Sequence, residues 1–189
     1  MSSGAEPPAP EPRADAAEAL RAEGRFADAA VVVDAAIERF GREGRILALA
    51  QAKLARGVLA HDLGDHAAAE ALLTQARSDL LAAQRPEAVA VCAFDLAIVL
   101  HDLGRLDDAL DRLVEARTIF ESLDRPLEVA GCNQNLGVVL HALGRDAEAR
   151  TRLLAARAGF AAAGRDADVA ECDHDLAVLR ETRPQAALV

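Results

Sequence analysis

The sequence repeats itself at an interval of 40 residues. The segments His61-Asp-Leu-Gly64, His101-Asp-Leu-Gly104 and His141-Ala-Leu-Gly144 lie at one phase of this interval, and Ala22-Glu-Gly24 is a degenerate fourth copy. The phase continues through small and large apolar positions: Ala29, Ala69, Ala109 and Ala149; Val33, Leu73, Leu113 and Leu153; Ala36, Ala76, Ala116 and Ala156; Phe40, Leu80, Phe120 and Phe160. Such a period is typical of stacked repeats, in which a single unit cannot bury its own apolar face. It favours binding over catalysis.

Composition and charge narrow the class of protein further. Apolar residues make up 52% of the 189 residues, but there is no Trp or Tyr, so alanine and leucine must form a core of tight helix contacts. The net charge of −10 repels phosphate backbones and disfavours nucleic acid as a partner. No run of roughly 18 apolar residues predicts a membrane span, and no secretion signal is evident at the N-terminus. We therefore expect a cytoplasmic protein without membrane contact.

Two breaks in each 40-residue unit divide the chain into helices. Glycines such as Gly104 suit the left-handed residue after a helix, and Pro86 and Pro126 suit a first helical turn. Residues 1–12 are rich in proline and are expected to be a disordered tail, with a solenoid over 13–182 and a second tail over 183–189. The predicted helices are 14–23, 26–41, 46–63, 66–83, 87–103, 106–122, 127–143, 146–162 and 167–181.

The three cysteines follow the same period, at Cys92, Cys132 and Cys172. Equivalent positions in successive repeats are about 10 Å apart, because packed helices are separated by 8–10 Å. This distance excludes a disulfide, which needs Cα atoms within about 7 Å, and a shared metal ion. We expect buried thiols that act as small apolar side chains.

The repeating residues resemble the tetratricopeptide repeat. The fourth unit matches its pattern with Leu136-Gly137, Leu140, Gly144, Ala149, Leu153 and Ala156, and the third with Leu96-Ala97, Leu100, Gly104, Ala109, Leu113 and Ala116. The period of 40 exceeds the usual 34, so each helix is nearly one turn longer. Arg56 and Ala60 replace the leucines expected in the second unit. A HEAT-type solenoid has the right period but does not predict this phasing of Leu-Gly and Ala.

The resemblance implies an all-α solenoid of antiparallel helix pairs, a right-handed superhelix of about four repeats with a C-terminal capping helix. In this family the first helices line a concave groove that holds a peptide or a partner helix. Positions that match the family's groove are the predicted partner-binding residues: Phe94, Asp95, Ile98, His101, Gln134, Asn135, Val138, His141, His174 and Asp175.

Two of these positions have alternative roles. Phe94 is the aromatic residue that leaves the repeat phase, and it is either an apolar anchor for a ligand or a ring packed between first helices. Asn135 either clamps a ligand's backbone through its amide or bonds to a neighbouring helix. Asp95 and Asp175 make the groove acidic, so a basic or neutral peptide complements it best.

The histidines His61, His101 and His141 form a ladder at the repeat interval. They are either solvated residues that close a helix or a pH-sensitive rim, and their spacing excludes a metal shared among them. We found no nucleophile motif, phosphate loop or metal-ligand spacing in the sequence, so we expect no catalytic residue, cofactor or metal.

The sequence as a whole predicts a non-catalytic adaptor that binds a peptide or helix of a partner protein. Two alternatives remain open at this point. The first is a regulatory protein that senses a short peptide and changes its superhelical pitch. The second is an accessory subunit of an enzyme encoded elsewhere.

Overall fold

The computed structural model describes residues 14–181, which form nine helices joined by turns, with no strand in that range. The helices are α1 (Ala14–Ala22), α2 (Phe26–Arg42), α3 (Ile46–Asp62), α4 (His66–Ala82), α5 (Pro86–Asp102), α6 (Leu106–Ser122), α7 (Pro126–Ala142), α8 (Asp146–Ala162) and α9 (Asp166–Glu181). Each predicted range agrees with its helix to within one residue. The predicted tails, 1–12 and 183–189, lie outside the described residues.

Residues with positive φ end the helices. Gly64 has φ +81°, its amide bonds the carbonyl oxygen of His61 at 2.8 Å, and the amide of Asp65 bonds that of Ala60 at 2.9 Å. These bonds satisfy the last carbonyls of α3 and turn the chain back. Gln84 and Asp124 take the same left-handed conformation, at φ 53°, without being glycine. The two breaks read from the sequence are therefore both helix–helix turns.

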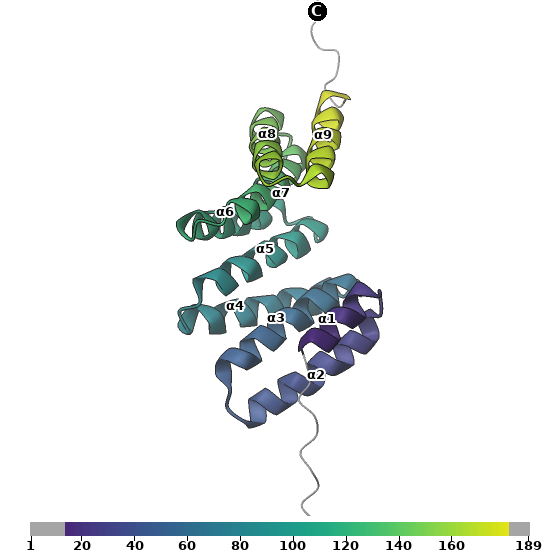
Figure 1. Ribbon diagram of the computed structural model, residues 1–189, viewed down its shortest axis with the longest axis vertical. Coiled ribbons are helices and arrows are strands. Elements are labelled where there is room, and N and C mark those ends of the chain that lie inside the picture. Colours follow the sequence, from purple (N-terminus) through teal and green to yellow (C-terminus); the bar gives the residue numbers. More distant parts are fainter. Residues whose placement is uncertain (1–13, 182–189) are drawn as a thin grey trace, which may run out of the picture.

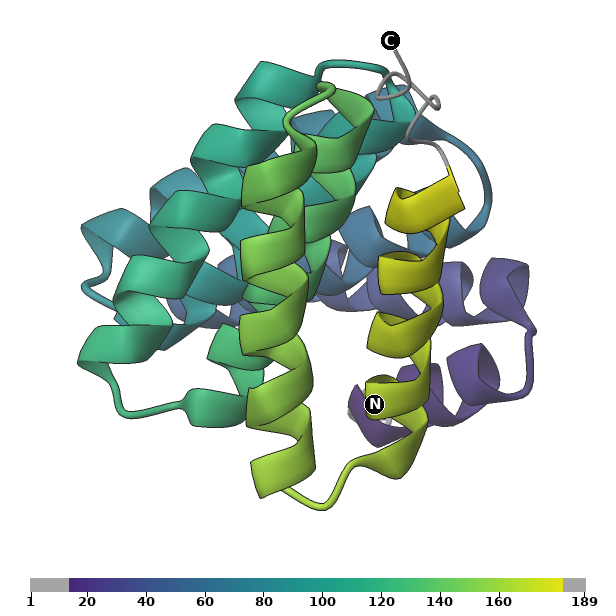
Figure 2. The same ribbon diagram turned by 90° about the horizontal axis from the view of Figure 1, so that it is seen from above.

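The helices pack as antiparallel pairs, α1/α2, α3/α4, α5/α6 and α7/α8, and α9 follows the last pair. The pairs stack along one long axis, with α1 and α2 at one end and α8 and α9 at the other (Figure 1). Seen along that axis, successive pairs lie one behind another (Figure 2). The fold is an all-α solenoid of about four repeats and a final helix, as the sequence predicts.

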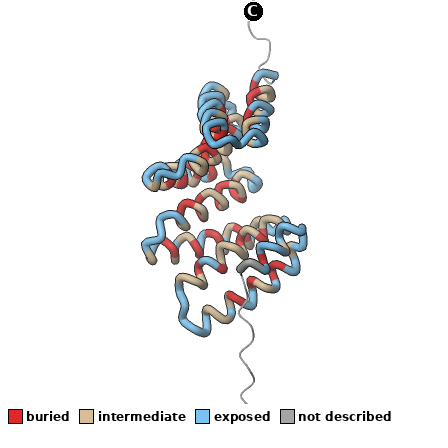
Figure 3. Tube along the Cα trace, viewed as in Figure 1, coloured by how far each residue is buried: buried red, intermediate tan, exposed pale blue. Residues whose placement is uncertain are grey.

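The repeat-phase apolar positions form the core between the layers. Ala69, Ala109 and Ala149 are 0% exposed, and the leucines that follow them one turn later are buried as well. Buried positions recur along one side of second helices such as α6, while their other side faces water, and the first helices α5 and α7 are covered over most of their length (Figure 3). Phe120 and Phe160 are also buried, but Phe40 at the same phase is only partly covered. The first unit is therefore less complete than the others.

Two glycines allow close approach of the helices within a pair. A Cβ on Gly137 of α7 would lie 2.5 Å from Cγ of Leu153 in α8 and 3.3 Å from the carbonyl oxygen of Ala149. A Cβ on Gly57 of α3 would lie 2.7 Å from Cγ of Leu73 in the same way. The side chain of the second helix thus occupies the space that a glycine leaves on the first.

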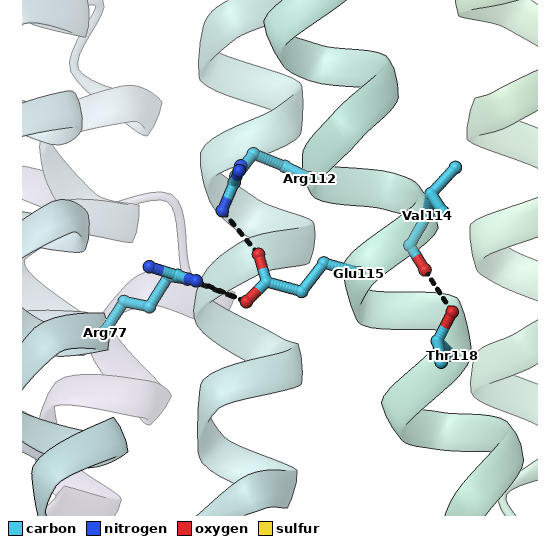
Figure 4. Close-up of polar contacts among 5 residues, drawn as sticks. All are labelled: Arg77, Arg112, Val114, Glu115 and Thr118. Carbon is cyan, nitrogen blue, oxygen red and sulfur yellow. Dashed lines mark hydrogen bonds and ion pairs between the residues drawn. The ribbon is translucent and has the colours of Figure 1, made fainter.

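The two helices of each pair form different faces of the solenoid. The first helices contact one another in series, α3 with α5, α5 with α7 and α7 with α9, more closely than the second helices do. The layers therefore converge on the side of the first helices, which is the inner face. On the outer face Glu115 of α6 accepts hydrogen bonds from Arg77 of α4, which link neighbouring repeats, and one from Arg112 of its own helix (Figure 4).

We predict that Gly137→Ala lowers the melting temperature. Alanine favours a helix over glycine by about 1 kcal/mol, but the added methyl group must displace buried Leu153, and overpacking typically costs about 1–3 kcal/mol. Gly131→Ala in the same helix is the matched control, because its Cβ would meet only the Phe94 ring, at 3.9 Å. Thermal unfolding of both variants tests the register: equal melting temperatures would show that α7 and α8 are not so close.

Candidate functional site

Four predicted partner-binding residues line one depression on the inner face. Ile98 and His101 lie on α5, and Asn135 and Val138 lie on α7. The depression encloses about 30 Å³, and Leu113 of α6 contributes to its lining. Val138 is 37% exposed at this point. The structure thus brings together apolar and polar side chains from two neighbouring repeats, as a side-chain subsite requires.

Asp95 lies beside a set of charged groups that extends toward the first repeat. Arg21 of α1 donates to both carboxylate oxygens of Asp62 in α3, at 2.5 and 3.2 Å. Burial raises the pKa of Asp95 to about 6, while Arg21 and His61 oppose this shift and Asp62 adds to it. Arg21 and His61 already bond other carboxylates, so the charge on Asp95 has no cation of its own.

Two polar links between neighbouring first helices share one register. Arg21 bonds Asp62, and one repeat later His61 Nε2 lies 2.7 Å from Asp102 Oδ2. The next pair in the series would be His101 with residue 142, but that residue is alanine. His101 Nδ1 instead lies 3.3 Å from Oδ1 of its neighbour Asp102. The links therefore join repeats one to two and two to three, and the series stops there.

The third histidine of the ladder turns away from this series. His141 Nδ1 lies 2.8 Å from Asp146 Oδ1, at the start of α8. The histidines of the ladder do not gather around a common point within residues 14–181, which agrees with their spacing in the sequence.

Phe94 and Asn135 have contacts within the protein. Phe94 is partly buried and packs against core residues of α5 and of the neighbouring helices. Asn135 Nδ2 donates to the carbonyl oxygen of Gly131 at 3.1 Å, a bond within its own helix and not to a neighbouring helix. This bond does not involve the carbonyl oxygen of the Asn135 side chain. The residue also lines the depression. The role of both residues in ligand contact stays a prediction.

The predicted residues nearest the C-terminus lie between α7 and α9. Gln134 Nε2 donates to Glu171 Oε2 at 3.4 Å. Burial raises the pKa of Asp175, and a hydrogen bond from Gln134 opposes that shift. His174 is exposed. These side chains form a polar margin of the inner face and are not part of the depression.

The sequence analysis missed a cavity of about 500 Å³ at the other end of the solenoid. It lies between α1, α2 and α3, where alanines and Phe40 form its walls and the guanidinium of Arg45 lies 4.7 Å from the Phe40 ring centre. In the third unit, Ala90 and Ala93 of α5 pack on the equivalent Phe120.

A second missed feature is a cluster of His61, His66 and Asp102. The sequence analysis compared histidines only at equivalent repeat positions, and His66 lies outside that phase. Its signal was a histidine five residues after His61, across the turn between α3 and α4.

The cysteines are free and buried, as the sequence predicts. Burial raises the pKa of Cys92 and that of Cys132 to about 12, and that of Cys172 to about 11. A thiol with so high a pKa carries almost no thiolate at neutral pH, so these side chains serve packing.

Comparison with known families identifies the repeats. Two models of the tetratricopeptide repeat match the sequence, at residues 49–122 and at residues 10–35. The chain therefore belongs to the tetratricopeptide-repeat family, whose helical repeats serve protein–protein interaction. A comparison with curated proteins finds no match. Within residues 14–181 no helix has the length and hydropathy needed to span a membrane.

Solved structures share this fold. Aspartyl phosphate phosphatase F from Bacillus subtilis aligns with a TM-score of 0.80 and 15% identity, over 87% of this chain and 43% of that one. A Rap protein complexed with competence and sporulation factor aligns with a TM-score of 0.75 and 17% identity, over 86% and 46%. The TPR-like repeats of a putative kinesin light chain from Podosopora anserina give 0.74 and 17%, over 88% and 82%. The chain spans less than half the length of the first two.

We predict that Asp95→Asn raises the melting temperature at pH 8 and that this gain fades below pH 6. Folding raises the pKa of Asp95 to about 6 from an ordinary value near 3.9, so the folded state holds an unfavourable charge above pH 6. That penalty is relieved as the pH falls from 6 toward 4. Thermal unfolding of wild type and variant across this range measures the difference.

Asp173→Asn is the control for this experiment. A hydrogen bond from Arg157 lowers the pKa of Asp173, so its charge favours the folded state at pH 8 and the variant should gain no stability there. A lower melting temperature for Asp95→Asn than for wild type at pH 8 would contradict the unfavourable placement of Asp95.

Proposed function

We propose that this protein is a non-catalytic adaptor that binds a peptide or a helix of a partner protein on the inner face of its first helices. The observation that carries the proposal is the depression between α5 and α7, where Ile98, His101, Asn135 and Val138 come together. Membership of the tetratricopeptide-repeat family supports an interaction role for this face.

The geometry of the depression supports a specific mode of contact. Ile98 and Val138 provide an apolar wall on which a partner side chain loses contact with water. Asn135 has two amide protons and a carbonyl oxygen, and one proton is used by Gly131. The remaining donor and acceptor match a backbone amide of a bound segment. Because both helices are fixed in the array, little ordering accompanies binding.

The charges favour a basic or neutral segment. Asp95 is partly buried on α5, and the Arg21 guanidinium and the His61 ring near it are engaged by Asp62 and Asp102. A lysine or arginine of a partner would stabilise the ionised form of Asp95 and offset the effect of burial. Asp175 and Glu171 add negative charge at the α9 end of the same face.

A peptide-sensing regulatory role is the second candidate. It is supported by the end of the polar series at Ala142, which leaves the junction between the third and fourth repeats without the link found at the two earlier junctions. A segment bound across α5 and α7 would lie over this junction, where Arg125 bonds Glu87 of α5 in place of the link at residue 142. One protein of similar fold is a Rap protein in complex with competence and sporulation factor.

We predict that Val138→Glu removes partner binding and that Val114→Glu does not. Val138 and Val114 are 37% and 45% exposed, but Val138 lines the depression and Val114 lies on α6. A carboxylate at position 138 would place a charge where an apolar part of the ligand is buried, and burying that charge is unfavourable. This effect outweighs the repulsion between the new carboxylate and the acidic groups of the inner face. Affinity purification with quantitative mass spectrometry, followed by titration with a peptide from the recovered partner, should show at least a tenfold loss of affinity for Val138→Glu alone.

Val138 and Val114 both lie at the surface, so replacing either with glutamate should have little effect on the core. The two variants also carry the same added charge. Equal recovery of partners by Val138→Glu and by wild type would place the binding surface elsewhere. Small-angle scattering of the wild type with the peptide separates the two candidates, because an adaptor keeps its dimensions and a sensor becomes more compact or more extended.

A further inference from the structure

Three side chains with metal-ligating atoms meet where the second repeat joins the third. His61 lies in the last turn of α3, His66 is the first residue of α4, and Asp102 is the last residue of α5. One ligand atom from each lies within 4.8 Å of the other two. The rings of the two histidines are tilted by 55°, with their centres 5.4 Å apart, so they do not stack face to face.

His66 has a polar atom whose bonding the protein itself does not satisfy. Its Nδ1 is buried, and no group among the described residues forms a hydrogen bond with it. A buried ring nitrogen without a partner is unfavourable, and such atoms are uncommon in native proteins. A cation bound at this cluster is one group that would engage the His66 ring.

His61 and His101 hold the carboxylate of Asp102 in one orientation. His101 Nδ1 lies 3.3 Å from Oδ1 of Asp102, while Oδ2 lies 2.7 Å from His61 Nε2. A carboxylate binds a metal ion in its ionised form. His101 is placed as an outer partner that holds the other oxygen.

We propose that His61, His66 and Asp102 bind one divalent cation of the zinc class. Two imidazoles and a carboxylate suit Zn²⁺, Co²⁺ or Ni²⁺ better than Mg²⁺ or Ca²⁺, which prefer oxygen ligands. Ligands about 2.0–2.2 Å from the ion are at most roughly 4.4 Å apart, so small side-chain rotations close the cluster. The ion takes the place of the proton between His61 Nε2 and Asp102 Oδ2, and that proton moves to Nδ1 of the neutral ring. Water completes the coordination.

The bound ion would join three helices. It would fix the turn between α3 and α4 to the end of α5, and so add to the link from His61 to Asp102 at this junction. Because a preformed site does not exist in the unfolded chain, binding stabilises the folded state in proportion to the logarithm of free metal. The role is to fix one repeat against the next.

The test uses the full chain without a polyhistidine tag, freed of metal by a chelator and titrated with ZnCl₂ by calorimetry. Co²⁺ then serves as a spectroscopic probe, since tetrahedral Co²⁺ absorbs visible light strongly. The variants are His66→Ala and Asp102→Asn, with His174→Ala as the matched control because it removes an exposed histidine on α9. Circular dichroism without metal establishes that each variant folds, and two ligand variants ensure that one misfolded protein does not decide the result.

We expect one Zn²⁺ per wild-type chain, a melting temperature that rises with Zn²⁺, and an intense Co²⁺ spectrum. Loss of an outer partner typically weakens metal binding by roughly 10–100-fold, so loss of a ligand should weaken it at least tenfold in both ligand variants. His174→Ala should bind as the wild type does. The proposal is overturned by a wild-type chain that binds no Zn²⁺, or by His66→Ala and Asp102→Asn binding it with unchanged affinity.

Discussion

Close approach of helices through small residues is the constraint on which the rest of this structure depends. Ala109 and Ala149 have no exposed surface, and the missing side chain of Gly137 provides the space that Leu153 fills. Interiors at native packing density tolerate few alternatives, so a helix placed by such contacts cannot slide by a residue without a clash or a void. The 40-residue period therefore sets both the composition of the layers and their register.

That register explains two polar links between neighbouring first helices. A residue near the end of one first helix meets the residue 41 positions later, which gives Arg21 with Asp62 and His61 with Asp102. Where residue 142 is alanine, the link is lost and His101 uses Asp102 in its own helix. Half-exposed ion pairs contribute only about 0–1 kcal/mol each, so these links do not hold the fold together. Their value is that they make one junction of a uniform scaffold different from another.

The sequence could predict the helices because glycine turns and alanine phasing are local and repeated signals. It was less informative where a unit departs from the pattern. Arg56 and Ala60 were expected to weaken the second unit, yet Ala60 is buried and Arg56 Nε bonds Asp34 Oδ1 at 2.9 Å. The cluster with His66 depends on side chains from three helices, whose distances follow from the superhelix and not from spacing along the chain. A comparison of equivalent positions identifies residues that recur in each repeat, and it misses a residue such as His66 that occurs in one repeat only.

The two proposed sites share a residue pair and are therefore linked in energy. His101 lines the depression on the inner face and also holds Oδ1 of Asp102, whose other oxygen belongs to the cation cluster. An ion that fixes Asp102 also fixes the ring of His101, and a ligand that draws His101 toward the groove pulls on the same carboxylate. Coupling between two binding sites is reciprocal, so the factor by which Zn²⁺ changes the affinity for a peptide equals the factor by which that peptide changes the affinity for Zn²⁺. The link between adaptor and regulator would then lie in one carboxylate at the junction of the second and third repeats.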